Sequence, residues 1–192
     1  FLKNINLKNS NAIDIGANVG TVSLAILSKG ASKIYSFEPG PYYKFLENNI
    51  KINKITNRIV IKKIGFSNNE GKLYWAETKN NPGNAHLIHS LDELKIENSN
   101  TVFNDESTFE EVYVSTLDIY FKKNIILNKL DLIKVDVEGM EDQVIEGGRE
   151  LIKKFRPYVI IETNKKSAKL KGYKCITPIF DFFYNNRYKS YS

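Results

Sequence analysis

The sequence predicts an α/β fold built on a mostly parallel, doubly wound sheet, and three observations support this. First, a short apolar stretch over residues 12–15 runs into a glycine-rich turn, and a helical pattern over 21–29 follows at once. Second, strand and helix patterns alternate with short connections, which predicts parallel strands joined by right-handed crossovers. Third, acidic residues stand at expected strand ends, where ligands bind in such sheets. These residues are Asp14, Glu38, Asp136 and Glu162.

The first half of the chain alternates strands and helices. Apolar runs bounded by turn residues mark the strands, and the helices show apolar residues at helical spacing. Gly30 is placed to end the first helix, and Pro41 is placed to open the second. The expected strands are residues 11–15, 33–37 and 58–64, and the expected helices are residues 20–29 and 41–52.

The middle of the chain, residues 68–116, breaks this rhythm and is expected to be an insertion on the substrate side. Residues 71–77 and 110–116 alternate apolar and polar side chains as strands do. A long polar stretch between them contains His86 and His89 and is expected to form a loop. Long loops beside a rigid sheet often carry specificity, so we expect this one to help select the substrate.

The last third of the chain returns to alternating strands and helices. Asp118 is expected to cap a short helix, and the pair Gly147–Gly148 weakens the middle of a longer one. The final strand of this part is apolar enough to predict a buried central strand. The tail, residues 170–192, contains the strand-like run GYKCITPI. The expected elements are strands 131–137 and 158–162 and helices 118–123 and 140–154.

Length and composition bound the class of protein. The 192 residues suffice for one domain with a sizeable core, and we expect residues 1–192 to be that domain. The net charge of +6 comes from dispersed lysines, which indicates a solvated surface more than a nucleic-acid-binding face. The single Cys175 excludes an internal disulfide. No apolar run reaches membrane-spanning length, and we expect a cytoplasmic protein. Because the chain begins with Phe1, it is expected to be part of a longer protein.

The glycine turn departs from the dinucleotide-binding fingerprint, in which the glycines follow the pattern G-x-G-x-x-G. Here Gly16, Asn18 and Gly20 alternate with Ala17 and Val19, and an acidic residue, Asp14, precedes the turn. Glycines let the backbone approach a ligand closely, and a carboxylate suits a cationic amino group better than a pyrophosphate. The turn therefore indicates S-adenosylmethionine, which carries an amino-acid tail and no phosphate. NAD is the competing ligand, and the different glycine spacing argues against it.

The residues after the second and third strands also indicate a nucleoside. Glu38 follows the glycine turn by ~20 residues, and an acidic side chain there accepts hydrogen bonds from ribose hydroxyls. Pro39 lies beside it, and Gly65 and Phe66 follow the third strand, where an adenine ring would lie. Two alternatives stay open, namely that Glu38 caps the next helix and that Phe66 is only a core residue.

The stretch KVDVEGME, residues 134–141, is the strongest candidate for the chemistry. Asp136 and Glu138 are two residues apart, so they share a face in extended backbone. Paired carboxylates can deprotonate a hydroxyl, orient a sugar or hold a divalent cation. The alternative is that Glu138 and Glu141 only favour the N-terminus of the next helix. A metal ion needs more oxygen ligands than this pair supplies, so we expect none.

The chain resembles the FkbM family of methyltransferases in motifs that occur in this order: IDIGANVG, SFEPGP, VSTLD, DLIKVDVEGMEDQVIEGG and PYVIIET. The resemblance covers residues 11–163. It implies a class I methyltransferase Rossmann-like fold, with a mostly parallel seven-stranded sheet, helices on both faces and a C-terminal antiparallel hairpin. It also implies S-adenosylmethionine as methyl donor and a hydroxyl acceptor, often on a sugar of a glycan or on a natural product. The matching cofactor positions are Asp14, Gly16, Asn18, Gly20 and Glu38, and the active-site motif contains Asp136 and Glu138.

Together these inferences predict an O-methyltransferase that methylates a hydroxyl of a sugar or small molecule. Asp136 or Glu138 is expected to be the base, while the other carboxylate orients the hydroxyl or a cation. Asp136 is also expected to border the cofactor. Further candidate bases are Glu162 and the loop residues His86 and His89.

Two alternative functions stay open. An RNA ribose 2'-O-methyltransferase would use the same fold and a set of lysines and carboxylates, which Asp136, Glu162 and either Lys153 or Lys154 could imitate. No cluster of aromatic and basic residues of the kind that binds RNA stands out, so a nucleic acid is the less favoured partner. The second alternative is a non-catalytic module that keeps the fold inside a larger protein.

Overall fold

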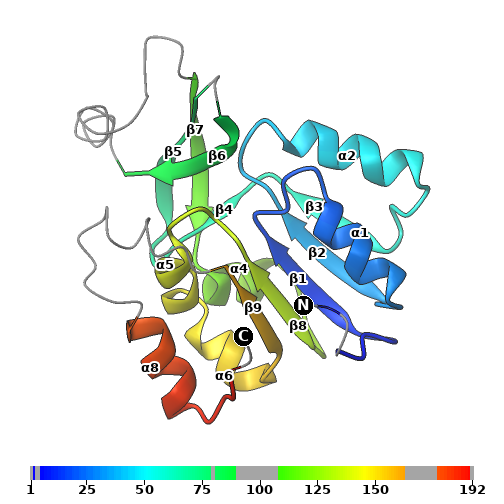
Figure 1. Cartoon of the computed structure of the whole chain (residues 1–192), viewed down its shortest axis with the longest axis vertical. Coiled ribbons are helices and arrows are strands. Elements are labelled where there is room, and N and C mark those ends of the chain that lie inside the picture. Colours follow the sequence, from blue (N-terminus) through cyan, green and yellow to red (C-terminus); the bar gives the residue numbers. More distant parts are fainter. Residues whose placement is uncertain (1, 3–4, 79–80, 90–107, 163–176, 191–192) are drawn as a thin grey trace.

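The computed structural model confirms the α/β fold and its parallel sheet (Figure 1). It describes residues 2, 5–78, 81–89, 108–162 and 177–190. The main sheet has five strands in the order β3-β2-β1-β8-β9, and every neighbouring pair is parallel. These strands are β1 (Asn11–Ile15), β2 (Lys33–Phe37), β3 (Ile59–Lys62), β8 (Leu132–Val135) and β9 (Tyr158–Ile161). The strand order changes direction between β1 and β8, which is where ligands bind in such sheets.

Helices cover both faces of this sheet, because the strands are apolar on both sides (Figure 1). On one face, Ile26 of α1 and Leu46 of α2 share a buried cluster with Ala12 of β1. On the other face, Ile13 of β1 packs in a cluster with Val144 of α5 and with residues of α4, α6 and α8. The helices are α1 (Thr21–Ser28), α2 (Tyr43–Ile52), α4 (Leu117–Asn124), α5 (Glu141–Glu146), α6 (Arg149–Phe155) and α8 (Thr177–Asn185).

The expected insertion contributes most of a second, four-stranded sheet in the order β4-β7-β5-β6. β5 pairs antiparallel with both β6 and β7, and β4 pairs parallel with β7. The expected strands over 71–77 and 110–116 are therefore confirmed. In the part of the chain that the structure describes, sheets of five and four strands take the place of the seven-stranded sheet that the resemblance implies. The strands of the second sheet are β4 (Gly65–Phe66), β5 (Gly71–Thr78), β6 (Asn81–Ile88) and β7 (Thr108–Ser115).

The expectation of a loop after β5 is wrong for residues 81–88, which form β6. The backbone of β6 pairs with β5 and places His86 opposite Ala76, so this histidine stands in a strand. β6 lies at an edge of the sheet, where a residue such as Pro82 is tolerated. The burial of Leu87 against the second sheet favours this pairing. The next part of the expected loop lies outside the described residues.

The single helix expected over residues 140–154 is two helices, α5 and α6, which are separated at Gly147 and Gly148. The chain passes too close to its neighbours there for side chains. A Cβ on Gly147 would overlap the carbonyl oxygen of Ser67, and a Cβ on Gly148 would lie 2.7 Å from the side chain of Leu117. Both glycines therefore serve the close packing of this segment.

The expectation that Asp118 caps the helix that contains it is wrong. Thr116 caps α4, because its hydroxyl oxygen accepts a hydrogen bond from the N–H of Ile119 at 3.1 Å. The carboxylate of Asp118 instead accepts hydrogen bonds from the N–H groups of Glu150 (3.1 Å) and Leu151 (2.7 Å). These N–H groups belong to the first turn of α6 and have no partner within that helix. Asp118 thus ties the start of α6 to α4.

The C-terminal tail is helical where the structure describes it. Residues 177–185 form α8, so the expected strand is wrong at its last residues, and residues 163–176 lie outside the described part. Pro178 is compatible with a first helical turn, whose N–H groups need no partner in the helix. Phe182 of α8 is buried in the core beside α4, α5 and α6. Among the described residues, no helix has both the length and the apolar character for a membrane span.

Replacing Gly147 with alanine is expected to destabilise the fold, because the added methyl group would overlap the Ser67 backbone. Overpacking costs about 1–3 kcal/mol, and a backbone oxygen cannot swing away as a side chain can. Urea unfolding should therefore give a free energy of unfolding lower by about 2 kcal/mol. Gly71→Ala is the matched control, since nothing lies within 4 Å of a Cβ there. Its effect should stay within about 0.5 kcal/mol, and equal effects of both substitutions would contradict the packing role of Gly147.

Candidate active site

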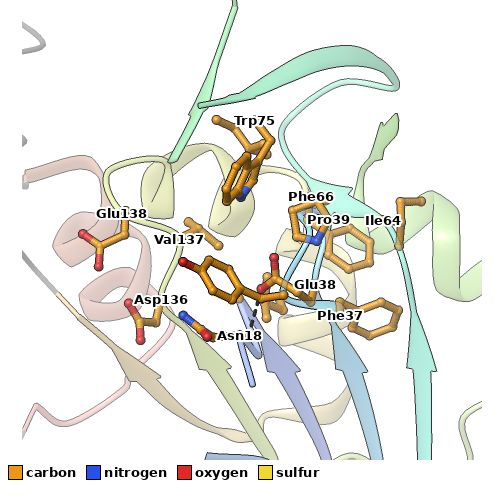
Figure 2. Close-up of a pocket in the computed structure, with 15 residues that line it drawn as sticks. Asn18, Phe37, Glu38, Pro39, Ile64, Phe66, Trp75, Asp136, Val137 and Glu138 are labelled. Carbon is orange, nitrogen blue, oxygen red and sulfur yellow. Dashed lines mark hydrogen bonds between the residues drawn. The ribbon is translucent and has the colours of Figure 1, made fainter. Parts of the chain in front are cut away.

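A cavity with about 680 Å³ of empty space opens at the carboxyl ends of β1, β2 and β8 (Figure 2). One end is apolar and is lined by Phe37 and Phe66. Figure 2 shows Asp136 and Glu138 together at the opposite end, with Trp75 above the space between in this view. The cavity therefore offers a flat apolar ring a place at one end and a polar or charged group a place at the other.

The glycine turn fits closely between the neighbouring strands. Gly16 has a φ of +71°, and a Cβ on it would overlap the carbonyl oxygen of Asp136. The N–H groups of Gly16 and Ala17 both donate to the carbonyl oxygen of Phe37, each at 3.0 Å. Because the protein itself uses these N–H groups, they are not offered to a phosphate. The turn is therefore suited to a ligand without phosphate at this point, as the sequence indicated.

Glu38 lines the cavity but is only 5% exposed. Its two carboxylate oxygens accept hydrogen bonds from the N–H groups of Asn18 (dashed in Figure 2) and Gly40, both at 2.9 Å. Burial raises the pKa of Glu38, and these two hydrogen bonds lower it by a smaller amount. Each oxygen keeps a second lone pair for a ligand hydroxyl. Helix α2 begins only at Tyr43, so the alternative that Glu38 caps this helix is wrong.

The structure brings most of the predicted cofactor residues together. Ala17 and Gly20 are the exceptions in the turn, since both are buried and neither lines the cavity. Phe66 is both a core residue and a cavity wall, because its ring packs edge to face on that of Phe37 with centroids 4.8 Å apart. The predicted cofactor residues that do line the cavity are Gly16, Asn18, Glu38, Pro39, Gly65, Phe66 and Asp136.

Asp14 is fully buried behind the glycine turn and does not line the cavity. The expected direct contact between its carboxylate and a ligand amino group is therefore not supported by its position. Asp14 Oδ2 accepts a hydrogen bond from Ser23 Oγ at 2.5 Å, and Oδ1 lies 3.3 Å from Lys134 Nζ. Sequence reasoning assigned no role to Lys134. The signal that could have found it is a lysine inside an apolar strand, LIKV.

Three carboxylates interact at the ends of β8 and β9. Burial raises the pKa of Glu138 to about 6, and the charges of Asp136, Glu162 and Glu141 add to this rise. The charge of Asp136 also raises the pKa of Glu162, which does not itself line the cavity. A carboxylate whose pKa lies nearer to neutral is a better proton acceptor than an ordinary one. Over the described ranges, no three His, Cys, Asp or Glu residues are grouped so that they could hold a metal ion.

The backbone of the following loop is held in an unusual conformation. Glu138 has a φ of +53° and is followed by Gly139 at +106°. A positive φ in a residue other than glycine costs of order 1 kcal/mol and needs support from its surroundings. Glu141 supplies it, because its carboxylate accepts hydrogen bonds from the N–H groups of Val137 and Gly139, at 3.1 Å each. Glu141 thus supports the loop at the start of α5, whereas Glu138 faces the cavity.

His89 is not brought to the acidic end of the cavity as the sequence suggested, and the side chain of His86 lies outside what the structure describes. His86 stands in β6, and His89 follows that strand. The ring Nε2 of His89 lies 3.3 Å from the side-chain nitrogen of Gln143 in α5, and the histidine is exposed and does not line the cavity.

Three aromatic residues that sequence reasoning missed also line the cavity, namely Phe37, Tyr42 and Trp75. Trp75 comes from β5 in the second sheet, and no local pattern connects it with the glycine turn. A Cβ on Gly40 would overlap its indole ring, so the turn after β2 packs directly on it. The hydroxyl of Tyr42 donates to the carboxylate of Glu77, and burial together with that carboxylate raises the pKa of Tyr42 to about 12.

Comparisons with known proteins show what this chain is similar to. The family described as the methyltransferase FkbM domain matches residues 14–184. Methyltransferase sdnD of Sordaria araneosa is 31% identical over an alignment of 173 residues, and the match covers 81% of this chain and 67% of that protein. The crystal structure of methyltransferase FkbM from Methylobacillus flagellatus KT has a TM-score of 0.61 and 19% identity, covering 96% of this chain and 39% of that chain. The chain thus spans only part of the length of either relative.

The family match and the fold support the same conclusion. The match extends over most of the chain and includes the glycine turn, Glu38 and the carboxylates Asp136 and Glu138. The Methylobacillus structure, at its low sequence identity, shows that the fold is shared. The assignment argues against a non-catalytic module, and it makes S-adenosylmethionine the cofactor. The chain therefore belongs to the FkbM methyltransferase domain family and is an S-adenosylmethionine-dependent methyltransferase domain.

Proposed function

We propose that this domain transfers a methyl group from S-adenosylmethionine to a hydroxyl oxygen, with a sugar hydroxyl as the acceptor. One observation carries the proposal: Glu138 lines the cavity, and its pKa is raised to about 6. A hydroxyl is a poor nucleophile until a base takes its proton, and a carboxylate of raised pKa suits this task. Asp136 and Glu162 nearby can accept further hydrogen bonds, which suits an acceptor with several hydroxyls.

The residues of the cavity fit S-adenosylmethionine, whose sulfonium methyl group is electrophilic without further activation. We assign Glu38 to the ribose hydroxyls, because its oxygens keep lone pairs at the cavity wall. Phe66 stands at the apolar end and suits the adenine ring. Gly16 and Asn18 are assigned to the amino-acid part, since the turn approaches the cavity closely. Asp136, at the polar end, favours the cationic groups of the donor.

Positioning and proton transfer contribute unequally to such a reaction. Holding the hydroxyl in line with the methyl group can lower the barrier by up to ~7–11 kcal/mol. A general base contributes ~10²–10⁴-fold, which is about 3–5 kcal/mol. The residues that place donor and acceptor therefore matter more for the rate than Glu138 does.

The contacts of α6 disfavour the RNA alternative. Lys153 pairs with Glu150 of the same helix at 3.1 Å, and the ammonium group of Lys154 lies over the ring of Phe155. These lysines are engaged within α6. The carboxylates at the polar end of the cavity would repel a phosphate backbone, which RNA-binding sites attract with cations. A neutral acceptor rich in hydroxyl groups suits this end better.

S-adenosylhomocysteine is expected to raise the melting temperature of the protein, whereas NAD is not. A ligand at ~100 times its dissociation constant adds about 2.7 kcal/mol, which is several degrees. Glu38→Gln should weaken binding by ~10–100-fold, because the amide offers the ribose no charged acceptor. Glu47→Gln, at a half-exposed position of α2, is the control. No shift with S-adenosylhomocysteine in a folded sample, or an undiminished shift in Glu38→Gln, would contradict this assignment.

Transfer of labelled methyl groups tests the acceptor. We expect label from S-adenosylmethionine in a panel of methyl hexosides and none in a single-stranded RNA oligonucleotide. Transfer to a hydroxyl gives a methyl ether, which is stable in alkali, whereas transfer to a carboxylate gives a methyl ester, which alkali hydrolyses. The labelled product should therefore survive alkali. Glu138→Gln should lower turnover by ~10²–10⁴-fold. Label in the RNA would favour the ribose alternative, and an alkali-labile product would rule out transfer to a hydroxyl.

The raised pKa of Glu138 should also be visible in the stability of the protein. The folded protein, with a pKa of about 6 against an ordinary 4.5, holds this proton more tightly than the unfolded chain does. The stabilising contribution is complete below pH 4.5 and is lost as the pH rises through about 6. Glu138→Gln cannot lose a proton, so it should gain stability relative to the wild type between pH 4 and pH 7. Solvent screening of this half-exposed group keeps the gain below about 1 kcal/mol. Urea unfolding of both proteins at pH 4 and pH 7 measures this gain. If the difference in free energy of unfolding between the variant and the wild type were the same at both pH values, the pKa of Glu138 would not be raised.

A further inference from the structure

Lys134 is a buried cation at the point where the glycine turn and the acidic end of the cavity meet. It stands in β8 and is 4% exposed. Its ammonium group lies 3.3 Å from Asp14 Oδ1 and 3.2 Å from Asp136 Oδ2. It also donates a hydrogen bond to the carbonyl oxygen of Gly16 at 2.7 Å. A single ammonium group therefore contacts β1, the glycine turn and a carboxylate of the cavity.

The partner of Lys134 on the β1 side is itself fixed. Asp14 is fully buried, and its other oxygen accepts a hydrogen bond from Ser23 Oγ of α1 at 2.5 Å. Ser23 Oγ lies 2.7 Å from Ser36 Oγ of β2. Polar contacts thus run from β2 through α1 and β1 to Lys134. Asp136 is only half-buried, so it is the partner whose position depends most on this ammonium group.

Stability alone does not explain a lysine at this place. Removing an ion pair from water costs several kcal/mol, and a well-packed apolar residue of similar volume often stabilises a protein as much or more. An ammonium group, however, can donate three hydrogen bonds at once to acceptors that would otherwise be independent. Here the ammonium group donates to the carbonyl oxygens of Ile15 and Gly16, at the turn assigned to the methyl donor, and it pairs by charge with the Asp136 carboxylate at the acidic end. The lysine is therefore better explained by the positions in which it holds its partners than by its contribution to stability.

We propose that Lys134 is a positioning residue, which sets the place of the Asp136 carboxylate relative to the glycine turn and so aligns the acceptor side of the site with the donor side. The acceptor half of this proposal rests on the proposed function, because that function places the hydroxyl at the acidic end. Lys134 does not line the cavity. It acts through the Gly16 carbonyl and through Asp136, without contact with the reacting atoms.

The positive charge of Lys134 has a second effect, which gives the proposal a distinctive readout. Burial and neighbouring negative charges raise the pKa values of Glu38, Glu138 and Glu162, and the charge of Lys134 partly offsets this rise. Removal of this charge should therefore raise the pKa of Glu138 further. The charged groups that act on Glu138 are Asp136 at the end of β8, Glu162 after β9, Glu141 in α5 and Lys134 in β8.

The experiment compares Lys134→Met and Lys134→Arg with the wild type and with a matched control. The control is Lys129→Met, which removes an exposed lysine paired with Asp131 at the other end of β8. Circular dichroism checks folding, calorimetry gives the dissociation constant for S-adenosylhomocysteine, and ¹³C NMR of labelled carboxyl groups gives the pKa of Glu138. The Glu138→Gln variant assigns the NMR signal. None of these readouts needs an acceptor.

We expect Lys134→Met to bind S-adenosylhomocysteine about tenfold more weakly, because the turn loses a charged hydrogen-bond donor. The pKa of Glu138 should rise by about one pH unit in this variant. Lys134→Arg keeps the charge and should keep that pKa near its wild-type value, while Lys129→Met should leave both quantities unchanged. If Lys134→Met does not fold, the double variant Asp14→Asn/Lys134→Met leaves no unpaired buried carboxylate and is measured in its place.

A folded Lys134→Met protein that is less stable but keeps the wild-type affinity and the wild-type pKa of Glu138 would overturn the proposal, since Lys134 would then be merely structural. Failure of the proposed function looks different. In that case Glu138 of the wild type would titrate near its ordinary value of 4.5, and Glu138→Gln would transfer methyl groups normally. The loss of S-adenosylhomocysteine affinity in Lys134→Met would still support the part of the proposal that concerns the turn.

Discussion

The contact between the glycine turn and the ends of two neighbouring strands fixes the geometry of the site. Gly16 lies against the carbonyl of Asp136 with no room for a Cβ, and the N–H groups of Gly16 and Ala17 share the carbonyl of Phe37. These contacts hold the ends of β1, β2 and β8 together. Glu38 follows Phe37 directly, so the same turn sets the places of the Glu38 carboxylate and of Asp136 at the acidic end. A side chain in place of Gly16 would separate the two.

The charges of the site follow from this close packing. The ammonium group of Lys134 lies behind the turn, and the carboxylates of Asp136, Glu138 and Glu162 lie in front of it, so negative charge is in excess. Burial raises the pKa of Glu138, and this excess of negative charge adds to the rise, which suits the role of base in the proposed function. The excess also favours a cationic sulfonium donor over its neutral product. In the proposed function, the same carboxylates would therefore help both to activate the acceptor and to exchange product for fresh donor.

The parallel sheet and the glycine turn could be predicted because their constraints are local in sequence. Apolar runs form the strands, and a close backbone approach requires glycine. The failures depend on partners far away along the chain. Pro82 belongs to a strand because β5 offers an edge to pair with, and Asp118 caps α6 because packing brings the N–H of Leu151 to it. For the same reason, only the fold reveals that Lys134 reaches Asp14.

The second sheet covers part of the site at the carboxyl ends of the parallel strands. Trp75 of β5 and Leu87 of β6 line the cavity, and each packs against a glycine. A Cβ on Gly40 would overlap the indole ring, and a Cβ on Gly65 would lie 3.0 Å from Leu87. The two sheets therefore meet through glycines at the edge where the cavity lies. Substitutions in the second sheet must keep these contacts, because a shift of Trp75 would move the turn at Gly40, which follows Glu38.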